Sequence, residues 1–261
     1  MRWPNGGVGQ RKSGFRTAWV LGLALCVCPF RAAQGQDAHG YWGRKNTVGV
    51  FAAYSNDSSH MLLGIAEGRK LLEIGGVYNR RILIGHRVNW QYSGEFLPMV
   101  LESDPLTQVT DYETSPQQVT YVQSLSPMPT CTQFSESYHG TAPDGTVFSG
   151  TDVYRCHGRR WAIGQAMSPV GFQWNFRPQR VLQPFLASHG GYLYTSKSIP
   201  VDGAGSFNFT FDFGVGLEWF RSAKRSWRLE YRYHHISNAG TTYEDPGIDN
   251  GLFQVTYAFG R

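Results

Sequence analysis

Residues 207–219 alternate between apolar side chains and polar or small ones without a break. Successive side chains of a β-strand point to opposite faces of the sheet, so this pattern predicts one long strand with an apolar face and a polar face. The apolar face is largely aromatic. It carries Phe207, Phe209, Phe211, Phe213, Val215, Leu217 and Trp219, and the polar face carries Asn208, Thr210, Asp212, Gly214, Gly216 and Glu218.

Shorter alternating runs, separated by turn residues, recur along the chain, and helical periodicity is almost absent. These runs predict eight strands. Their expected bounds are Thr47–Ser55, Lys70–Arg80, Arg87–Pro98, Arg160–Phe176, Val181–Tyr194, Phe207–Phe220, Ser226–Ile236 and Gly251–Phe259.

Aromatic and aliphatic side chains on one face, with small and polar ones on the other, are typical of transmembrane barrels. We therefore expect an all-β fold over residues 36–261: an eight-stranded antiparallel transmembrane β-barrel of the outer-membrane type. A soluble β-sandwich or a lipocalin-like barrel is the alternative. Past Phe30, no apolar run approaches the roughly 18 residues of a spanning helix, so membrane insertion requires a closed barrel.

The N-terminal residues predict a signal peptide. Basic residues precede an apolar run, Ala18 to Phe30, and small residues follow it, so we expect a leader over residues 1–35. A lipoprotein signal at Cys26 is the rival, but the leucine before this cysteine is too large for a good processing site. The leader implies export.

Removing the leader changes the charge of the chain. Five of the 24 Lys and Arg residues lie in residues 1–35, which contain no acid, so 19 basic residues remain against 19 acidic ones. The excess of basic residues that gives the whole chain a pI near 9.0 therefore lies in the leader. A mature chain of about zero net charge gives no argument for a nucleic-acid partner.

Two cysteines, Cys131 and Cys156, remain after the leader, because Cys26 and Cys28 leave with it. In an exported chain, a pair within one connection predicts a disulfide rather than a metal site or a nucleophile.

The lengths of the connections predict how the barrel is oriented. With both termini periplasmic, connections after odd-numbered strands are extracellular and long. The connection after the third strand is a long insertion, Met99–Arg159. The connection after the seventh strand is residues 238–250. Connections after even-numbered strands are short, as at residues 177–180 and 221–225. The end of the seventh strand therefore lies at the extracellular rim.

A histidine and a serine end the apolar face of this seventh strand. His235 and Ser237 share a face with Tyr231 and Tyr233, whereas His234 lies on the charged face and is expected to hydrogen-bond in the interior. If the last two strands form a hairpin, Asp249 reaches the same surface, unless a bulge shifts its parity. His235, Ser237 and Asp249 are then expected to cluster on the lipid-facing side.

Three stretches around this cluster resemble a known family. HISNAG at residues 235–240, DPGID at residues 245–249 and the final aromatic strand are similar to PagL-type lipid A 3-O-deacylases, an acyloxyacyl hydrolase-like outer-membrane family. The likeness is strongest over residues 160–261, including SPVG at residues 168–171 and QWNF at residues 173–176. It does not extend to residues 99–159.

The resemblance implies a serine esterase without a metal or cofactor. Ser237 would be the nucleophile, His235 the base, and Asp249 the acid that orients the imidazole. Asn238 and the Gly240 N–H would be the oxyanion donors. The family's acid is commonly glutamate, so aspartate is a departure, and Glu244 or Asp245 would be the substitutes.

The expected function is therefore hydrolysis of the 3-O-linked acyl chain of lipid A. The substrate would be lipid A or lipopolysaccharide in the outer leaflet of the bacterial outer membrane. Two alternatives stay open. One is a phospholipid or other acyl-ester hydrolase with the same triad, and the other is a non-catalytic structural or binding barrel.

Overall fold

The computed structural model describes residues 40–114 and 119–261, so the expected signal peptide at residues 1–35 lies outside the described residues. The described ranges contain strands and one short 3₁₀ turn, η1. Their bounds are β1 Asn46–Ser55, β2 Lys70–Ile84, β3 Val88–Thr114, β4 Val119–Pro127, β5 Phe134–Thr141, β6 Val147–Phe176, β7 Leu182–Thr195, η1 Asp202–Ala204, β8 Phe207–Ser222, β9 Arg225–Ser237 and β10 Ile248–Gly260.

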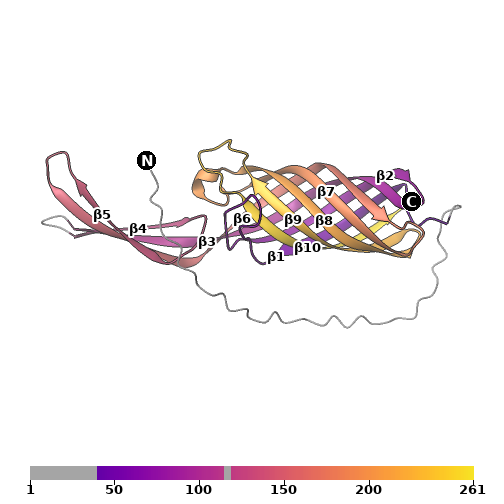
Figure 1. Cartoon of the computed structure of the whole chain (residues 1–261), viewed down its shortest axis with the longest axis horizontal. Helices are drawn as coiled ribbons and strands as arrows, with labels where there is room; N and C mark the ends of the chain where they lie inside the picture. Colours follow the sequence, from indigo (N-terminus) through magenta and orange to yellow (C-terminus); the bar gives the residue numbers. More distant parts are fainter. Residues whose placement is uncertain (1–39, 115–118) are drawn as a thin grey trace, which may run out of the picture. The chain divides into compact units, whose positions relative to one another are not determined.

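Eight of these strands close into a ring of antiparallel pairs (Figure 1). Going round the ring, the order is β1, β2, β3, β6, β7, β8, β9 and β10, and β10 pairs back onto β1. The ring confirms the predicted eight-stranded antiparallel barrel. In the part of the chain that the structure describes, no helix is long and apolar enough to cross a membrane.

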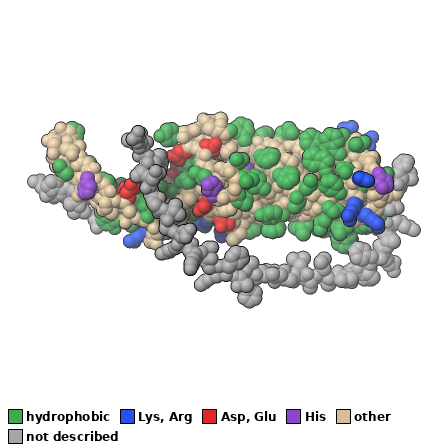
Figure 2. Space-filling model, in the orientation of Figure 1, with side chains coloured by type: hydrophobic (Ala, Val, Ile, Leu, Met, Phe, Trp, Pro, Cys, Tyr) green, Lys and Arg blue, Asp and Glu red, His purple; other side chains and the backbone are tan. Residues whose placement is uncertain are grey.

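The outer wall is apolar and the interior is polar, as the alternation predicts. Along β8 the exposed positions include Phe209, Phe211, Phe213, Val215 and Leu217, and the buried ones include Asn208, Thr210, Asp212 and Glu218. Figure 2 shows hydrophobic side chains over the barrel wall, with acidic side chains gathered near one end and basic ones near the other. An apolar outer wall around a polar interior is typical of a lipid-facing barrel.

Ion pairs neutralise the charges inside the barrel. Arg232 lies 3.0 Å from Glu95 and 3.1 Å from Glu230, and His189 Nδ1 lies 2.9 Å from Asp212. His234 also faces this interior, but both of its ring nitrogens lack a hydrogen-bond partner, and Glu73 is 3.9 Å away. The expected hydrogen bond of His234 was therefore wrong, because Arg232 already pairs with Glu95, Asp212 and Glu230, and Glu73 lies beyond hydrogen-bond distance.

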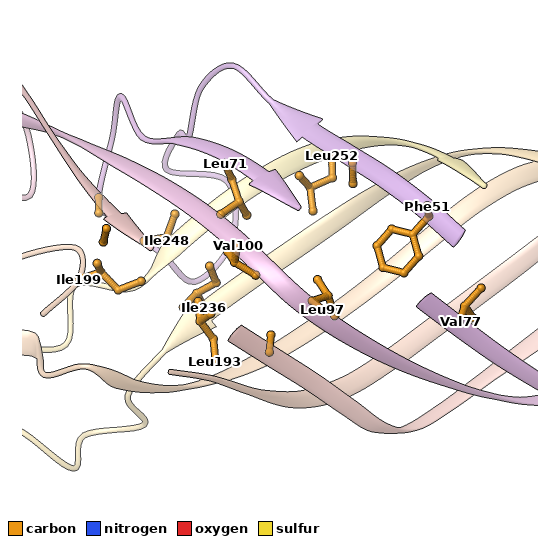
Figure 3. Close-up of a cluster of buried hydrophobic side chains, with 14 residues drawn as sticks. Phe51, Leu71, Val77, Leu97, Val100, Leu193, Ile199, Ile236, Ile248 and Leu252 are labelled. Carbon is orange, nitrogen blue, oxygen red and sulfur yellow. The ribbon is translucent and has the colours of Figure 1, made fainter. Parts of the chain in front are cut away.

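A cluster of apolar side chains lies in the interior toward the rim that carries the long connections. Figure 3 shows side chains from several strands and connections pointing toward one another there. Ile236 and Ile248 are direct cross-strand partners in this cluster. These two residues alternate along β9 and β10 with the outward-facing residues of the candidate site and point into the barrel. The wall that carries the site is therefore supported from inside by packed side chains. Other members are Leu71, Val100, Leu193, Ile199 and Leu252.

The stretch from Met99 to Arg159 contains strands rather than a simple loop. β3 runs on to Thr114 and β6 begins at Val147, and β4 and β5 pair with their outer halves in the order β4-β3-β6-β5. The expected end of the third strand at Pro98 was therefore wrong. Outside the apolar belt a strand no longer needs an apolar face, so its alternation fades while its pairing continues. The predicted disulfide between Cys131 and Cys156 is confirmed and ties the β4–β5 connection to β6.

Candidate active site

The end of β9 brings the predicted site residues to the outer face of the barrel. His235 pairs across the sheet with Asp249 of β10 and with Phe211 of β8, and Ser237 pairs with Phe209 of β8. Directly paired residues point to the same face, so the polar groups stand beside two exposed phenylalanines. The pairing of β9 with β10 has no bulge, so Asp249 lies on the same face as His235, as the alternation predicts.

The His235 imidazole is hydrogen-bonded to Asp249. Nδ1 lies 2.7 Å from Oδ1, and a carboxylate can only accept, so the imidazole donates its Nδ1–H. The His235 side chain is 12% exposed and that of Asp249 is 0% exposed. The contact leaves Nε2 of this tautomer as an acceptor, which is the form a general base needs.

Further donors fix the Asp249 carboxylate. The Tyr233 hydroxyl donates to Oδ1 at 2.8 Å, and the backbone amides of Leu62 and Leu63 donate to Oδ2 at 2.8 and 2.9 Å. Sequence reasoning missed these residues. A backbone amide is present in every residue but proline, so the sequence does not mark which amides act as donors. For Tyr233, the sequence indicated only that its side chain shares the outward face with His235.

The two amides belong to the β1–β2 connection, which lies along the start of β10. Ile65 N donates to Pro246 O at 2.7 Å, and Ala66 N donates to Gly247 O at 3.1 Å. Gly64 permits this approach, because a Cβ there would lie 2.7 Å from Asp249 N. The acid is therefore held from both its own hairpin and a connection far away in the sequence.

Gly247 fits closely beneath the histidine ring. Its φ of 59° lies in the left-handed region that favours glycine. A Cβ at this position would lie 3.1 Å from His235 Cε1. Any larger residue would crowd the imidazole that the carboxylate orients.

Ser237 shares the outward face with His235, two residues along the strand, about 6.6 Å in backbone rise. Among the residues that the structure describes, no hydrogen bond joins Ser237 Oγ to His235. Such bonds are often long in enzymes without substrate and shorten in the complex. The structure thus brings His235 and Asp249 into contact and places Ser237 beside them.

Asn238 and Gly240 hold the β9–β10 connection together. The Asn238 amide group donates to Ala204 O and Thr242 Oγ1, each at 2.8 Å, and to Glu244 O at 2.6 Å. Gly240 N is shared between Asn238 Oδ1 and Asp245 Oδ2, each at 2.9 Å. Neither expected oxyanion donor is therefore free in this structure.

The alternative acids occupy other positions. Asp245 accepts hydrogen bonds from Asn238 N at 3.2 Å and from Gly240 N within its own connection. Glu244 is exposed and lies beside Gly203. The observed partner of His235 is Asp249, as the parity predicts.

Buried charges also fix the rim around the site. The Arg69 guanidinium, 0% exposed, lies 3.3 Å from Asp104 and donates to the carbonyls of Met128 and Pro129. Burial lowers the pKa of Arg69, and Asp104 opposes this effect. Arg160 lies 3.0 Å from the other oxygen of Asp104. The rim connections are therefore joined through arginine rather than left as separate loops.

One group of potential metal ligands occurs within the described residues. Ligand atoms of Glu95, His189 and Asp212 lie within 4.8 Å of one another inside the barrel. Arg232 already pairs with both carboxylates, and Ser93 contacts His189 Nε2 at 2.9 Å. The group faces away from the outer surface that carries Ser237, so it takes no part in the candidate site.

The family comparison matches half of the chain. The model of the lipid A 3-O-deacylase (PagL) family matches residues 127–258, which include His235, Ser237 and Asp249. The chain belongs to the PagL family. The resemblance in the sequence is thereby confirmed. Membership in this family supports the interpretation of the chain as an outer-membrane lipid A deacylase.

Solved outer-membrane proteins are also similar to the chain. The outer membrane enzyme PagL shares 13% identity, covering 82% of this chain and 99% of that one, with a TM-score of 0.45. Neisserial surface protein A shares 13% identity, covering 83% of this chain and 97% of that one, with a TM-score of 0.38. No curated protein matches the chain significantly.

Proposed function

We propose that this PagL-family barrel is a serine esterase that hydrolyses the ester of the acyl chain at position 3 of lipid A. The observation that carries the proposal is the 2.7 Å contact between His235 and a buried Asp249, with Ser237 on the same outward face. A hydroxyl, an imidazole and a carboxylate in this order make up a nucleophile, a base and an orienting acid.

In the proposed reaction, Ser237 Oγ attacks the ester carbonyl carbon while His235 Nε2 accepts the hydroxyl proton. The tetrahedral intermediate collapses, the carbon–oxygen bond to the sugar breaks, and His235 returns the proton to the departing sugar oxygen. Water then attacks the acyl-serine with His235 again as base, which releases a fatty acid and restores Ser237. Asp249 stabilises the imidazolium at both stages without taking its proton.

Stabilisation of the tetrahedral oxyanion is assigned to the β9–β10 connection. The Gly240 N–H is exposed and is shared between two acceptors. The oxyanion would replace both of them as one strong, charged acceptor of this N–H. Asn238 is more firmly engaged, and its oxyanion role requires exchange of one of its bonds to Ala204, Thr242 or Glu244. A single donor of this kind lowers a barrier by about 2.7–4 kcal/mol.

The position of the site fits a substrate that stays in the membrane. Ser237 lies on the outer wall, at the rim end of the strand, beside Phe209 and Phe211. In an outer-membrane barrel this level meets the boundary between headgroups and acyl chains of the outer leaflet. An ester at that boundary reaches Ser237 while its acyl chain remains among its neighbours.

The test is product analysis with purified, refolded protein. Lipid A and a phospholipid are presented separately in mixed micelles, beside the Ser237→Ala protein. Release of the 3-O-linked chain from lipid A alone, absent in Ser237→Ala, supports the proposal. Hydrolysis of the phospholipid alone would assign the broader acyl-ester hydrolase. No hydrolysis of either substrate would favour a non-catalytic barrel.

A further inference from the structure

The β1–β2 connection carries an exposed apolar segment next to the site. Met61, Leu62, Leu63 and Ile65 are exposed, with Leu62 at 72% and Leu63 at 65%, and the intervening Gly64 is buried. Four apolar side chains so close together in an exposed connection, without an intervening charge, are uncommon unless they bind something. We call residues 61–65 the rim segment.

The backbone of the rim segment holds the proposed catalytic acid. Its Leu62 and Leu63 amides donate to Asp249 Oδ2, while the other oxygen of Asp249 binds His235. Gly64 lies against the β10 backbone, so the neighbouring apolar side chains project away from the barrel. The same residues thus present apolar side chains outward and hydrogen-bond donors inward.

The occupant that fits the rim segment is the acyl-chain layer of the outer leaflet. The segment lies at the level of Asp249 and His235, beside Phe209 and Phe211 of the apolar outer wall of β8. Its apolar side chains therefore extend the wall that already faces lipid. Each leucine that moves from water into acyl chains gains free energy in proportion to its exposed apolar area.

We propose that the rim segment inserts into the outer leaflet and that this insertion holds the Leu62 and Leu63 amides on Asp249, so that contact with lipid completes the alignment of His235. The inference rests on the proposed function, because Asp249 acts there as the orienting acid. Leu62 and Leu63 are positioning residues: they act on His235 through Asp249.

Insertion is tested without reference to activity. An environment-sensitive fluorophore is attached to Leu63→Cys and, as a control, to Asp144→Cys in the exposed turn between β5 and β6. In phospholipid bilayers the Leu63 label should shift to the blue and be quenched by lipids with brominated chains, and the Asp144 label should not. Equal spectra at the two positions would overturn insertion.

The coupling to Asp249 is tested by kinetics in the same bilayers with a short-chain, water-soluble ester. Leu62→Ser with Leu63→Ser should lower kcat about ten-fold and leave KM unchanged, because a segment that lipid no longer holds keeps its backbone amides less firmly on Asp249 and so weakens these charge-assisted hydrogen bonds. The matched control is Ile82→Ser with Leu83→Ser, an exposed pair at the opposite end of the barrel, which should retain wild-type constants. Wild-type kcat in the rim variant would overturn the coupling.

The Asp249→Asn background separates positioning from general damage. There the Leu62→Ser and Leu63→Ser pair should lower kcat no further, because both changes act through one carboxylate. Additive losses would overturn the coupling. If the wild-type protein hydrolysed neither the ester nor lipid A, the proposed function would fail, and the fluorophore would still decide whether the rim segment inserts.

Discussion

His235 Nδ1 lies 2.7 Å from Asp249 Oδ1 across the β9–β10 pair, and the Asp249 side chain is completely buried. A buried carboxylate that contacts a largely buried imidazole selects one tautomer of that imidazole. In this PagL family member, the contact between His235 and Asp249 is the part of the proposed triad that is already formed without substrate.

Replacing Asp249 by asparagine should abolish most of the activity. The amide keeps the volume of the carboxylate but does not stabilise the imidazolium, and the corresponding change in a serine protease lowers kcat by about 10⁴. Steady-state kinetics on lipid A measures the effect. Glu244→Gln is the matched control, because Glu244 is an exposed acid of the neighbouring connection, and wild-type kcat is expected. A larger loss in Glu244→Gln than in Asp249→Asn would identify a different acid.

Tyr233→Phe should reduce kcat by about two-fold to ten-fold, the usual net effect of one hydrogen bond. Its hydroxyl donates to the Asp249 oxygen that also binds His235. The control is Tyr231→Phe, two residues earlier on the same face, where the Tyr231 ring contacts Phe253 at a tilt. Equal kinetic constants in both variants would mean that the Tyr233 hydroxyl does not support the acid.

Gly64→Ala should lower kcat by at least about ten-fold, because hydrogen bonds to a charged group are worth about 1.5–3 kcal/mol each. The added Cβ would lie 2.7 Å from Asp249 N and displace the Leu62 and Leu63 amides. Gly76→Ala is the control, since its Cβ would lie 3.6 Å from the nearest atom. Kinetics and the yield of folded barrel are measured together. Unchanged kcat in Gly64→Ala would show that β10 tolerates a shifted connection.

Arg69→Met should destabilise the barrel by up to about 3–5 kcal/mol, because it removes one of the two arginines that neutralise the buried Asp104. Asp104 would keep only Arg160, and the carbonyls of Met128 and Pro129 would lose their donor. Thermal unfolding of the refolded protein measures the effect. The exposed Arg87→Met at the other end should leave the melting temperature unchanged. Identical melting of the two variants would show that the rim network adds no net stability.

The barrel and the contact between His235 and Asp249 follow from local patterns in the sequence. Alternation with period two defines the strands, and the parity of one hairpin places His235 and Asp249 on one face. The same reasoning ended the third strand too early, because the strand continues to Thr114 beyond the apolar belt, where its pattern fades.

Other features of the site are not encoded in residue types. The donors on Asp249 are backbone amides of Leu62 and Leu63, which any residue but proline supplies. The engagement of Asn238 by its own connection depends on how that connection folds back on Ala204 and Glu244. The contacts of Leu62 and Leu63 with Asp249, and of Asn238 with Ala204, join segments far apart in the sequence, so no local pattern reports them.

The most direct test of the central claim is mass spectrometry of lipid A from cells that produce the wild-type protein, Ser237→Ala or His235→Ala at equal levels in the outer membrane. The 3-O-linked acyl chain should be missing only in cells with the wild-type protein. Loss of that chain in cells with Ser237→Ala would contradict the assignment of Ser237 as the nucleophile.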